Sequence, residues 1–306
     1  MIILLGILTD DPLIAVLNCL RRMDAEFVLV DQTEISNTEV EIEVGSEVSG
    51  ALHYGGKEID LGSVTAAFLR SYDFRRLHEI QDAGEKSQVW RHAAGVDDIL
   101  YSWMELTPAL VLNRPSDMGS NNSKPYQASL IQAAGFSVPE TLITTDPVAA
   151  RAFWQAHGEV VYKSISGVRS IVSRLTKERG ERLSEVANCP TQFQEYVPGT
   201  DYRVHVVGSE VFSCEVVSKA DDYRYAHSHG YGVEILRREL PADVSERCVS
   251  LARKCGLALA GIDLRLRPDG SWCCFEVNPS PAFTYYQQAT GDRIDEAVAG
   301  LLASRR

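Results

Sequence analysis

Two apolar segments near the end of the chain, residues 258–267 and 272–278, are joined by Pro268-Asp269-Gly270, a combination typical of a turn between antiparallel strands. The polar side chains inside these segments include Asp263, Glu276 and Asn278. Because residues two apart in a strand share a face, pairing through this turn places all three on one side of a sheet. A carboxylate buried in an apolar strand is costly without a cation, and carboxylate and amide oxygens suit Mg²⁺. The hairpin therefore predicts a magnesium site, and the alternative is a set of solvated surface residues.

The first part of the chain alternates strand and helix signals, which predicts an α/β domain over residues 1–112. Gly55-Gly56 indicates a hairpin turn, and Pro108 ends the longest helical pattern. The expected strands are 2–8, 26–31, 40–44, 51–54, 64–70 and 109–112, and the expected long helix is 85–106. Arg70-Ser71-Tyr72-Asp73 ends a strand and could reach a ligand across the sheet edge, but a solvated strand end is the favoured reading.

After Asn113 the pattern changes, and a second unit is expected to begin. Asp146-Pro147 is a helix start, with an N-cap followed by proline at the first helical position, and Gly158 ends that helix. Further helices are expected at 124–134, 242–255 and 292–303, with strands dominating between 159 and 217. The chain therefore reads as a mixed α/β fold in three parts, residues 1–112, 113–198 and 199–306.

Composition excludes several classes of protein. The formal net charge of -12 disfavours nucleic acid or an anionic membrane surface as the main partner. No apolar run approaches the roughly 20 residues that span a bilayer, so we expect no membrane contact and a cytoplasmic protein. Seven cysteines without a C-x-x-C pair predict reduced and mostly buried thiols, and disfavour a disulfide framework.

A second group of candidate residues surrounds Pro198-Gly199. An apolar strand that ends in an extended segment offers free backbone groups, which commonly read the edge of a purine, and the residues involved are Gln194, Glu195, Tyr196 and Val197. Asp201 is placed to accept from ribose hydroxyls, and Arg203 presents a cationic fork for phosphate or carboxylate. An ordinary Pro-Gly connection between strands is the alternative.

A third group follows the strand that ends in Lys163. A loop of small residues, which includes Ser164 and Gly167, can lay backbone N–H groups against a triphosphate while Lys163 contacts its oxygens. Neither G-x-x-x-x-G-K-[ST] nor G-x-G-x-x-G occurs, so a P-loop and a Rossmann dinucleotide site lack their fingerprints.

Two stretches rich in aromatic and polar residues can each be interpreted in two ways. Residues 221–232 form either a substrate loop or a mobile polar loop, and a zinc site at His227 and His229 lacks further ligands. Phe283, Tyr285 and Tyr286 either shape an acceptor pocket or serve in packing.

Taken in order, these residues together with Lys124 resemble the ATP-grasp superfamily of carboxylate-amine ligases. Within it the chain is similar to the RimK-like branch, and more closely to the graspetide (microviridin-type) ribosomal peptide maturases. The segments that carry the resemblance are Glu58–Leu61, Phe68–Arg70, Asn122–Lys124, Phe136–Pro147, Arg203–Gly208, Asp263–Leu266, Glu276–Pro279 and Tyr286–Gly300. Ser280-Pro281 is closer to the RimK-type Asn-x-Ser-Pro pattern than to the maturases.

The resemblance implies an ATP-grasp fold with an N-terminal pre-ATP-grasp domain, a central lid and a C-terminal catalytic domain. It implies that ATP and Mg²⁺ are required, that a carboxylate is activated as an acyl phosphate, and that an amine or hydroxyl then forms an amide or ester. The implied roles are phosphate contacts for Lys124 and Lys163, adenine contacts for Glu195 and Val197, a ribose contact for Asp201, metal ligation by Asp263, Glu276 and Asn278, and catalysis by Arg203 with Arg265.

The substrate remains open at this level. A side chain of a ribosomally made precursor peptide is the leading expectation, and a small-molecule or amino-acid ligase is the alternative. A non-catalytic nucleotide-binding scaffold is disfavoured by the metal carboxylates. RimK-type relatives are frequently oligomeric, so a homo-oligomer is also an expectation.

Overall fold

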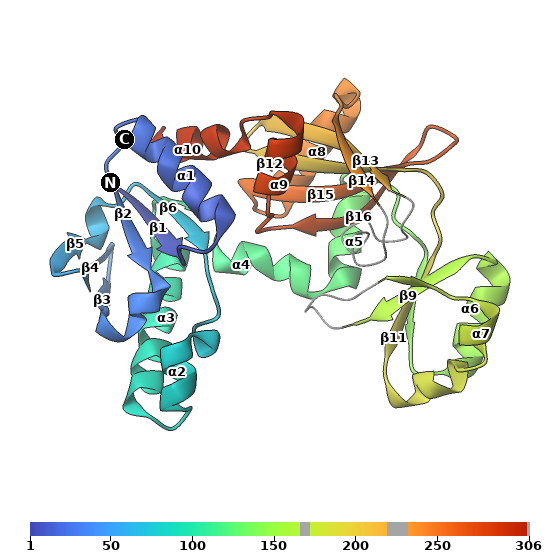
Figure 1. Ribbon diagram of the computed structural model, residues 1–306, viewed down its shortest axis with the longest axis horizontal. Helices are drawn as coiled ribbons and strands as arrows, with labels where there is room; N and C mark the ends of the chain where they lie inside the picture. Colours follow the sequence, from blue (N-terminus) through green and yellow to red (C-terminus); the bar gives the residue numbers. More distant parts are fainter. Residues whose placement is uncertain (166–171, 219–231, 305–306) are drawn as a thin grey trace.

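The computed structural model describes residues 1–165, 172–218 and 232–304. Figure 1 shows three lobes, which we call the N-terminal, central and C-terminal lobes, with the short helix α4 (Pro115–Met118) lying between them. The expected mixed α/β fold is confirmed. Among these residues, no helix combines the length and the apolar character that crossing a membrane demands.

The N-terminal lobe is built on a parallel sheet with the strand order β2-β1-β6-β7. Its strands are β1 (Ile2–Gly6), β2 (Phe27–Asp31), β6 (Ala66–Arg70) and β7 (Leu110–Leu112). Alternate residues of β1 enter two different cores, Ile2 with α1 (Asp11–Arg22) and Ile3 with α3 (Gln88–Leu106). Helices on both faces explain why this strand is apolar throughout.

Smaller elements complete this lobe. The predicted hairpin is confirmed within an antiparallel sheet of β3 (Glu39–Val44), β4 (Val48–Tyr54) and β5 (Lys57–Asp60). The predicted helix 85–106 begins instead at Gln88, because Ser87 caps it by accepting a hydrogen bond from the Trp90 N–H at 3.0 Å. The remaining elements are α2 (His78–Ala83) and 3₁₀ turns at Gln32–Asn37, Leu61–Ser63 and Phe74–Arg76.

The central lobe is a four-stranded sheet with the order β10-β9-β11-β8. Its strands are β8 (Thr141–Thr144), β9 (Val160–Ser164), β10 (Ser173–Arg174) and β11 (Thr191–Glu195). The helix predicted from Asp146-Pro147 is α6 (Pro147–His157), which is capped by Asp146 and ends at Gly158. Two helical turns, α7 (Lys177–Gly180) and a 3₁₀ turn at Leu183–Asn188, lie where strand signals were expected to dominate.

The C-terminal lobe is a five-stranded sheet with the order β14-β13-β12-β15-β16. Its strands are β12 (Thr200–Val207), β13 (Glu210–Ser218), β14 (Val233–Arg237), β15 (Leu259–Leu266) and β16 (Trp272–Asn278). Helices α8 (Ala242–Lys254) and α5 (Lys124–Ala133) pack on one face, where Val204 of β12 and Ile131 of α5 belong to the same hydrophobic core. The other face therefore carries the polar residues Arg203 and His205 of the same strand.

The end of the chain returns to the N-terminal lobe. The predicted helix 292–303 is observed as α10 (Ile294–Ala303), preceded by a separate helix α9 (Thr284–Thr290) that ends at Gly291. Helix α10 lies beside α1 in Figure 1, and Ile294 and Val298 share a core with Leu13. A 3₁₀ turn at Gly119–Asn122 leads into α5. The lobes are thus tied together by helices that cross between them.

Candidate active site

The predicted hairpin of β15 and β16 brings its polar residues to one face, but it does so through a register shift between Asp263 and Leu264 that the sequence pattern did not predict. Asp263 pairs directly with Glu276, and Asn278 pairs with Gly261 two residues further along β15. Direct partners in an antiparallel pair share a face, so the three oxygen-bearing side chains lie together. Asp263 and Glu276 are 22% and 25% exposed at the side chain, which is enough for a ligand to reach them. In the described part of the chain no three His, Cys, Asp or Glu residues cluster for a metal, and the third oxygen-bearing side chain of this face, Asn278, is an amide.

Each of these carboxylates also contacts a basic side chain. The Lys124 Nζ lies 2.7 Å from Glu276 Oε1, and Arg203 Nη1 lies 2.7 Å from Asp263 Oδ1. Lys124 comes from the start of α5 and Arg203 from β12, so two elements far apart in the sequence meet at the hairpin. Hard oxygen donors flanked by fixed cations match what a metal triphosphate needs. The residues present therefore fit Mg²⁺ together with phosphate oxygens.

Arg203 is held by its surroundings. It is 6% exposed, its Nε lies 3.4 Å from the Nε2 of His205, and its guanidinium lies 5.5 Å from the ring centre of Tyr286. Burial, assisted by the neighbouring Arg203 charge, holds the pKa of His205 well below its usual value, so this imidazole is neutral. A Cβ at Gly261, which pairs with His205 on the neighbouring strand, would overlap Arg203 Nη2, so this glycine leaves the space for the guanidinium.

Arg265 and Asp201, predicted for separate roles, form one bidentate pair. Arg265 donates from Nε and Nη2 to the Asp201 carboxylate at 2.7 and 2.8 Å, and from Nη1 to the carbonyl of Val197 at 2.7 Å. The pair therefore ties the segment after β11 to β12. Glu195 accepts a single hydrogen bond from Arg267 Nη2 at 3.0 Å, and the guanidinium carbon of Arg174 lies 3.7 Å from the ring centre of Tyr196.

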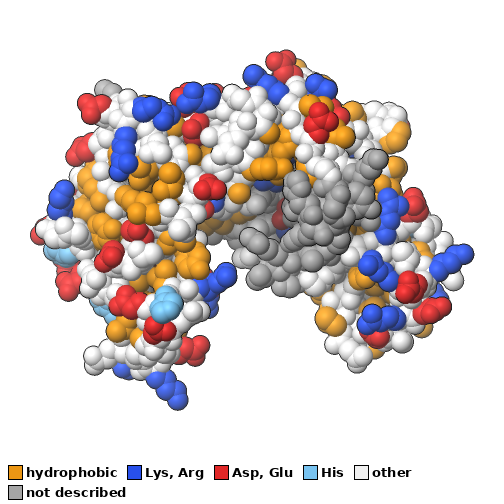
Figure 2. Space-filling view, in the orientation of Figure 1, with side chains coloured by type: hydrophobic (Ala, Val, Ile, Leu, Met, Phe, Trp, Pro, Cys, Tyr) orange, Lys and Arg blue, Asp and Glu red, His pale blue; other side chains and the backbone are white. Residues whose placement is uncertain are grey.

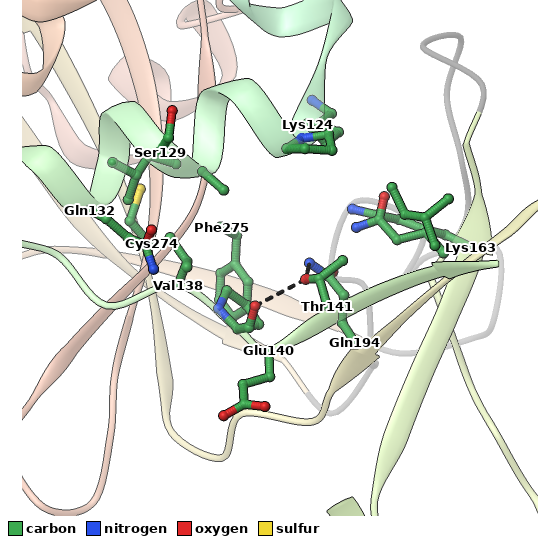
Figure 3. Close-up of a pocket in the computed structure, with 16 residues that line it drawn as sticks. Lys124, Ser129, Gln132, Val138, Glu140, Thr141, Lys163, Gln194, Cys274 and Phe275 are labelled. Atoms are coloured by element: carbon green, nitrogen blue, oxygen red, sulfur yellow. Dashed lines mark hydrogen bonds between the residues drawn. The ribbon is translucent and has the colours of Figure 1, made fainter. Parts of the chain in front are cut away.

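A cavity of about 490 Å³ lies between α5, the central sheet and β16. Figure 3 shows Lys124 on α5 at the top and Lys163 on β9 at the right, with Phe275 and Gln194 below them. Gln194 donates to the Thr141 hydroxyl at 2.9 Å. This volume lies in the range of pockets that hold small ligands. In Figure 2 the molecule is hollowed between the N-terminal and central lobes.

One buried acceptor in this cavity has no partner among the described residues. Gln192 lines the cavity, is 2% exposed, and its Oε1 accepts no hydrogen bond. Such an atom costs stability unless a donor reaches it. The exocyclic amino group of a purine is one donor of this kind.

The predicted nucleotide residues divide into two groups. Lys124, Lys163 and Gln194 line the cavity, whereas Glu195, Tyr196, Val197 and Asp201 lie in the segment next to it. Ser164 ends β9 and is exposed, and Gly167 lies outside the described residues, as do His227, His229 and the 221–231 part of the expected loop.

Sequence reasoning missed several residues of this region. Gln192 and Phe275 line the cavity, and the alternation of β11 could have identified Gln192, because it shares a face with Gln194.

The expected solvated strand end at Arg70 is wrong. Its side chain is 8% exposed, because it is buried against Asp10 and Ser280. Phe283 is fully buried, which favours its packing role, whereas Tyr285 is 48% exposed.

Comparison with known proteins places this site in context. The signature described as a RimK-like ATP-grasp domain matches residues 121–302, more than half of the chain. Glutathione synthetase of Salmonella typhimurium is 31% identical over 111 residues, which cover 33% of this chain and 34% of that protein. The chain thus matches about a third of the length of this relative.

Two solved structures resemble nearly the whole chain. The macrocyclase MdnC of Microcystis aeruginosa, bound with the precursor peptide MdnA, has a TM-score of 0.80 at 20% identity and covers 99% of both chains. The ATP-grasp ligase PsnB, complexed with minimal precursor, Mg and ADP, has a TM-score of 0.80 at 24% identity and covers 99% of this chain and 96% of its own. At these identities the likeness shows the fold.

Proposed function

Because the chain belongs to the RimK-like ATP-grasp family, we propose that it is an ATP- and Mg²⁺-dependent ligase that joins a carboxylate to an amine or a hydroxyl. The observation that carries the proposal is the pairing of Asp263 with Glu276 on one sheet face, beside the cations Arg203 and Lys124. A scaffold that only binds nucleotide has no need of two partly buried metal carboxylates.

In the proposed reaction a substrate carboxylate oxygen attacks the γ-phosphorus of ATP, the bond to ADP breaks, and an acyl phosphate forms. The amine or hydroxyl then attacks the carbonyl carbon, phosphate leaves, and the acceptor's proton passes to solvent. Mg²⁺ held by Asp263, Glu276 and Asn278 would neutralise triphosphate charge. Lys124 and Lys163 bind phosphate oxygens, and Arg203 stabilises the acyl phosphate, so positioning supplies most of the catalysis.

The remaining predicted residues bind the nucleotide and the substrate. Gln194 and the segment through Val197 bind the adenine, with Asp201 at the ribose, and Arg265 assists at the substrate carboxylate while holding Asp201 in place. We propose the division 1–112, 113–198 and 199–306 as pre-ATP-grasp domain, lid and catalytic domain, with α5 packed on the catalytic sheet.

For the substrate we propose side chains of a ribosomally made precursor peptide. Support comes from the likeness of nearly the whole chain to MdnC and PsnB, both of which were solved with precursor peptides. A small-molecule carboxylate-amine ligase is the second candidate, and the stretch similar to glutathione synthetase favours it. The two candidates differ because a small-molecule ligase needs no site for a leader peptide.

A ligation screen tests the proposal. ADP release is measured with panels of carboxylate and amine or hydroxyl pairs, including candidate peptides, and product mass separates the candidates, because each bond formed within one peptide removes one water. We expect Glu276→Ala to abolish ADP formation and Glu210→Ala, an exposed residue of the same sheet, to leave it intact. Tight ATP binding without turnover on any pair would favour a scaffold instead.

A further inference from the structure

Arg70, at the end of β6 in the N-terminal lobe, is hydrogen-bonded to the C-terminal lobe. Its Nη1 donates to the Ser280 hydroxyl at 2.7 Å and to the Pro281 carbonyl at 3.3 Å. These partners are 210 and 211 positions away in the sequence. The contact therefore joins the edge of the parallel sheet to the loop that follows β16.

The guanidinium is fixed from its other side by Asp10. Arg70 donates from Nε and Nη2 to the two oxygens of Asp10 at 2.9 and 2.7 Å, a bidentate pair. Asp10 is itself fixed, because it caps α1 by accepting from the Leu13 N–H at 2.9 Å. A rigid helix start thus sets the direction of the Arg70 fork.

The loop that Arg70 holds is directly connected to a proposed metal ligand. The backbone N–H of Ser280 donates to Asn278 Oδ1 at 2.9 Å. An amide oxygen has two lone pairs, so this bond leaves one of them for a metal while fixing the plane of the amide. The hydrogen-bonded path runs from Asp10 through Arg70 and Ser280 to Asn278.

Two more side chains hold neighbouring residues of the same segment. Buried Gln127 of α5 donates to the Val277 carbonyl at 2.8 Å and accepts from its N–H at 3.1 Å, which continues the pairing at the open edge of β16. Buried Asn113 donates to the Pro279 carbonyl at 2.6 Å. Each of the residues that flank Asn278 is therefore anchored from outside the hairpin.

We infer that Arg70 is a positioning residue for Asn278, so that the N-terminal lobe forms part of the metal site. The inference rests on the proposed function, in which Asn278 binds Mg²⁺. Partners that orient a metal ligand affect metal affinity strongly, about 10- to 100-fold when they are removed. Arginine is required because lysine cannot span the Asp10 carboxylate and the Ser280 hydroxyl together.

The test measures nucleotide binding instead of turnover. The dissociation constant of AMPPNP is determined by calorimetry with Mg²⁺ and with EDTA. The constant with EDTA divided by the constant with Mg²⁺ gives a ratio that reports how strongly the metal links the nucleotide to the protein. We expect Arg70→Lys to reduce this ratio about tenfold. Its matched control is Arg75→Lys, because Arg75 also forms a bidentate pair with an aspartate, Asp73, but at the exposed surface.

The reference variant Asn278→Ala distinguishes a failure of this inference from a failure of the proposed function. If Asn278→Ala leaves the ratio unchanged, the metal assignment in the proposed function is wrong. If Asn278→Ala lowers the ratio and Arg70→Lys does not, the inference is overturned and the proposed function stands.

Ser280→Ala provides a variant at an exposed position in case Arg70→Lys does not fold. It removes only the hydroxyl that accepts from Arg70, so it should also lower the ratio. In the double variant with Arg70→Lys, the ratio should fall by less than the product of the two separate effects. Two results would contradict the hydrogen-bonded path from Arg70 to Asn278. One is a double variant whose ratio falls by the full product of the two separate effects, and the other is a Ser280→Ala protein with the same ratio as the parent.

Discussion

Replacement of Asn113 by alanine should destabilise the protein strongly. Asn113 is 2% exposed, donates to the carbonyls of Leu259 and Pro279 at 2.7 and 2.6 Å, and accepts from the N–H groups of Ala258 and Leu259 at 2.9 and 3.1 Å. Each such bond contributes about 1 kcal/mol net, so four of them give a loss of about 4 kcal/mol in the free energy of unfolding.

Urea denaturation followed by fluorescence and by circular dichroism measures this loss, and agreement of the two probes justifies a two-state treatment. Asn113→Asp keeps the oxygen that accepts from the two N–H groups but turns a negatively charged oxygen toward the two carbonyls. The loss in the free energy of unfolding should therefore be at least as large as for Asn113→Ala. The control is Asn37→Ala, an exposed asparagine that donates to Glu34, which should change stability by about 0.5 kcal/mol or less. A loss below about 1 kcal/mol for Asn113→Ala would refute the accounting of these bonds.

Three further outcomes are expected. Gly261→Ala should lower the rate of ADP formation about 100-fold with little change in fold by circular dichroism, because its Cβ displaces Arg203; a rate near that of the parent would show that Arg203 can move without cost. Burial, then the neighbouring acidic charges, raises the pKa of Asp97 to about 6, so the folded state loses stability as pH rises from about 4 to about 6. Asp97→Asn should therefore raise the Tm at about pH 7.5 and leave it unchanged at about pH 3, and equal shifts at both would contradict this. Of the seven thiols only Cys189 is exposed, so a single thiol should react rapidly with a disulfide reagent in the native protein, and Cys189→Ser should remove that fast phase.

Local patterns predicted the hairpin that carries Asp263 and Glu276 because everything that forms it lies within about twenty residues of chain. The Pro-Asp-Gly turn is confirmed, but its register pairs Leu264 with Cys274, and simple alternation would then pair Asp263 with Phe275. A register shift between Asp263 and Leu264 pairs Asp263 with Glu276 instead, and local patterns did not predict this shift. The helix start at Asp146-Pro147 was predictable for the same reason, since the cap and its acceptor are two residues apart.

Contacts between distant segments were not predictable in this way. Arg70 looked like a solvated strand end because its partners Ser280 and Pro281 are more than 200 residues away. Arg265 and Asp201 were assigned separate roles, although the antiparallel register of β12 and β15 makes them direct partners. Gln192 shares a strand face with the predicted Gln194, but only the structure shows that this face lines a cavity.

The sequence by itself indicated which oxygen donors come together, because Asp263, Glu276 and Asn278 lie on the two strands of one locally encoded hairpin. The structure decided that they share a face, through the register shift between Asp263 and Leu264. Only the tertiary structure decided which cation meets each carboxylate, Lys124 with Glu276 and Arg203 with Asp263, and which side chains hold Asn278 in place. The physical reason is that these pairings depend on how helices and sheets pack, and many distant groups of the same charge compete for each carboxylate until packing brings one of them within hydrogen-bonding distance.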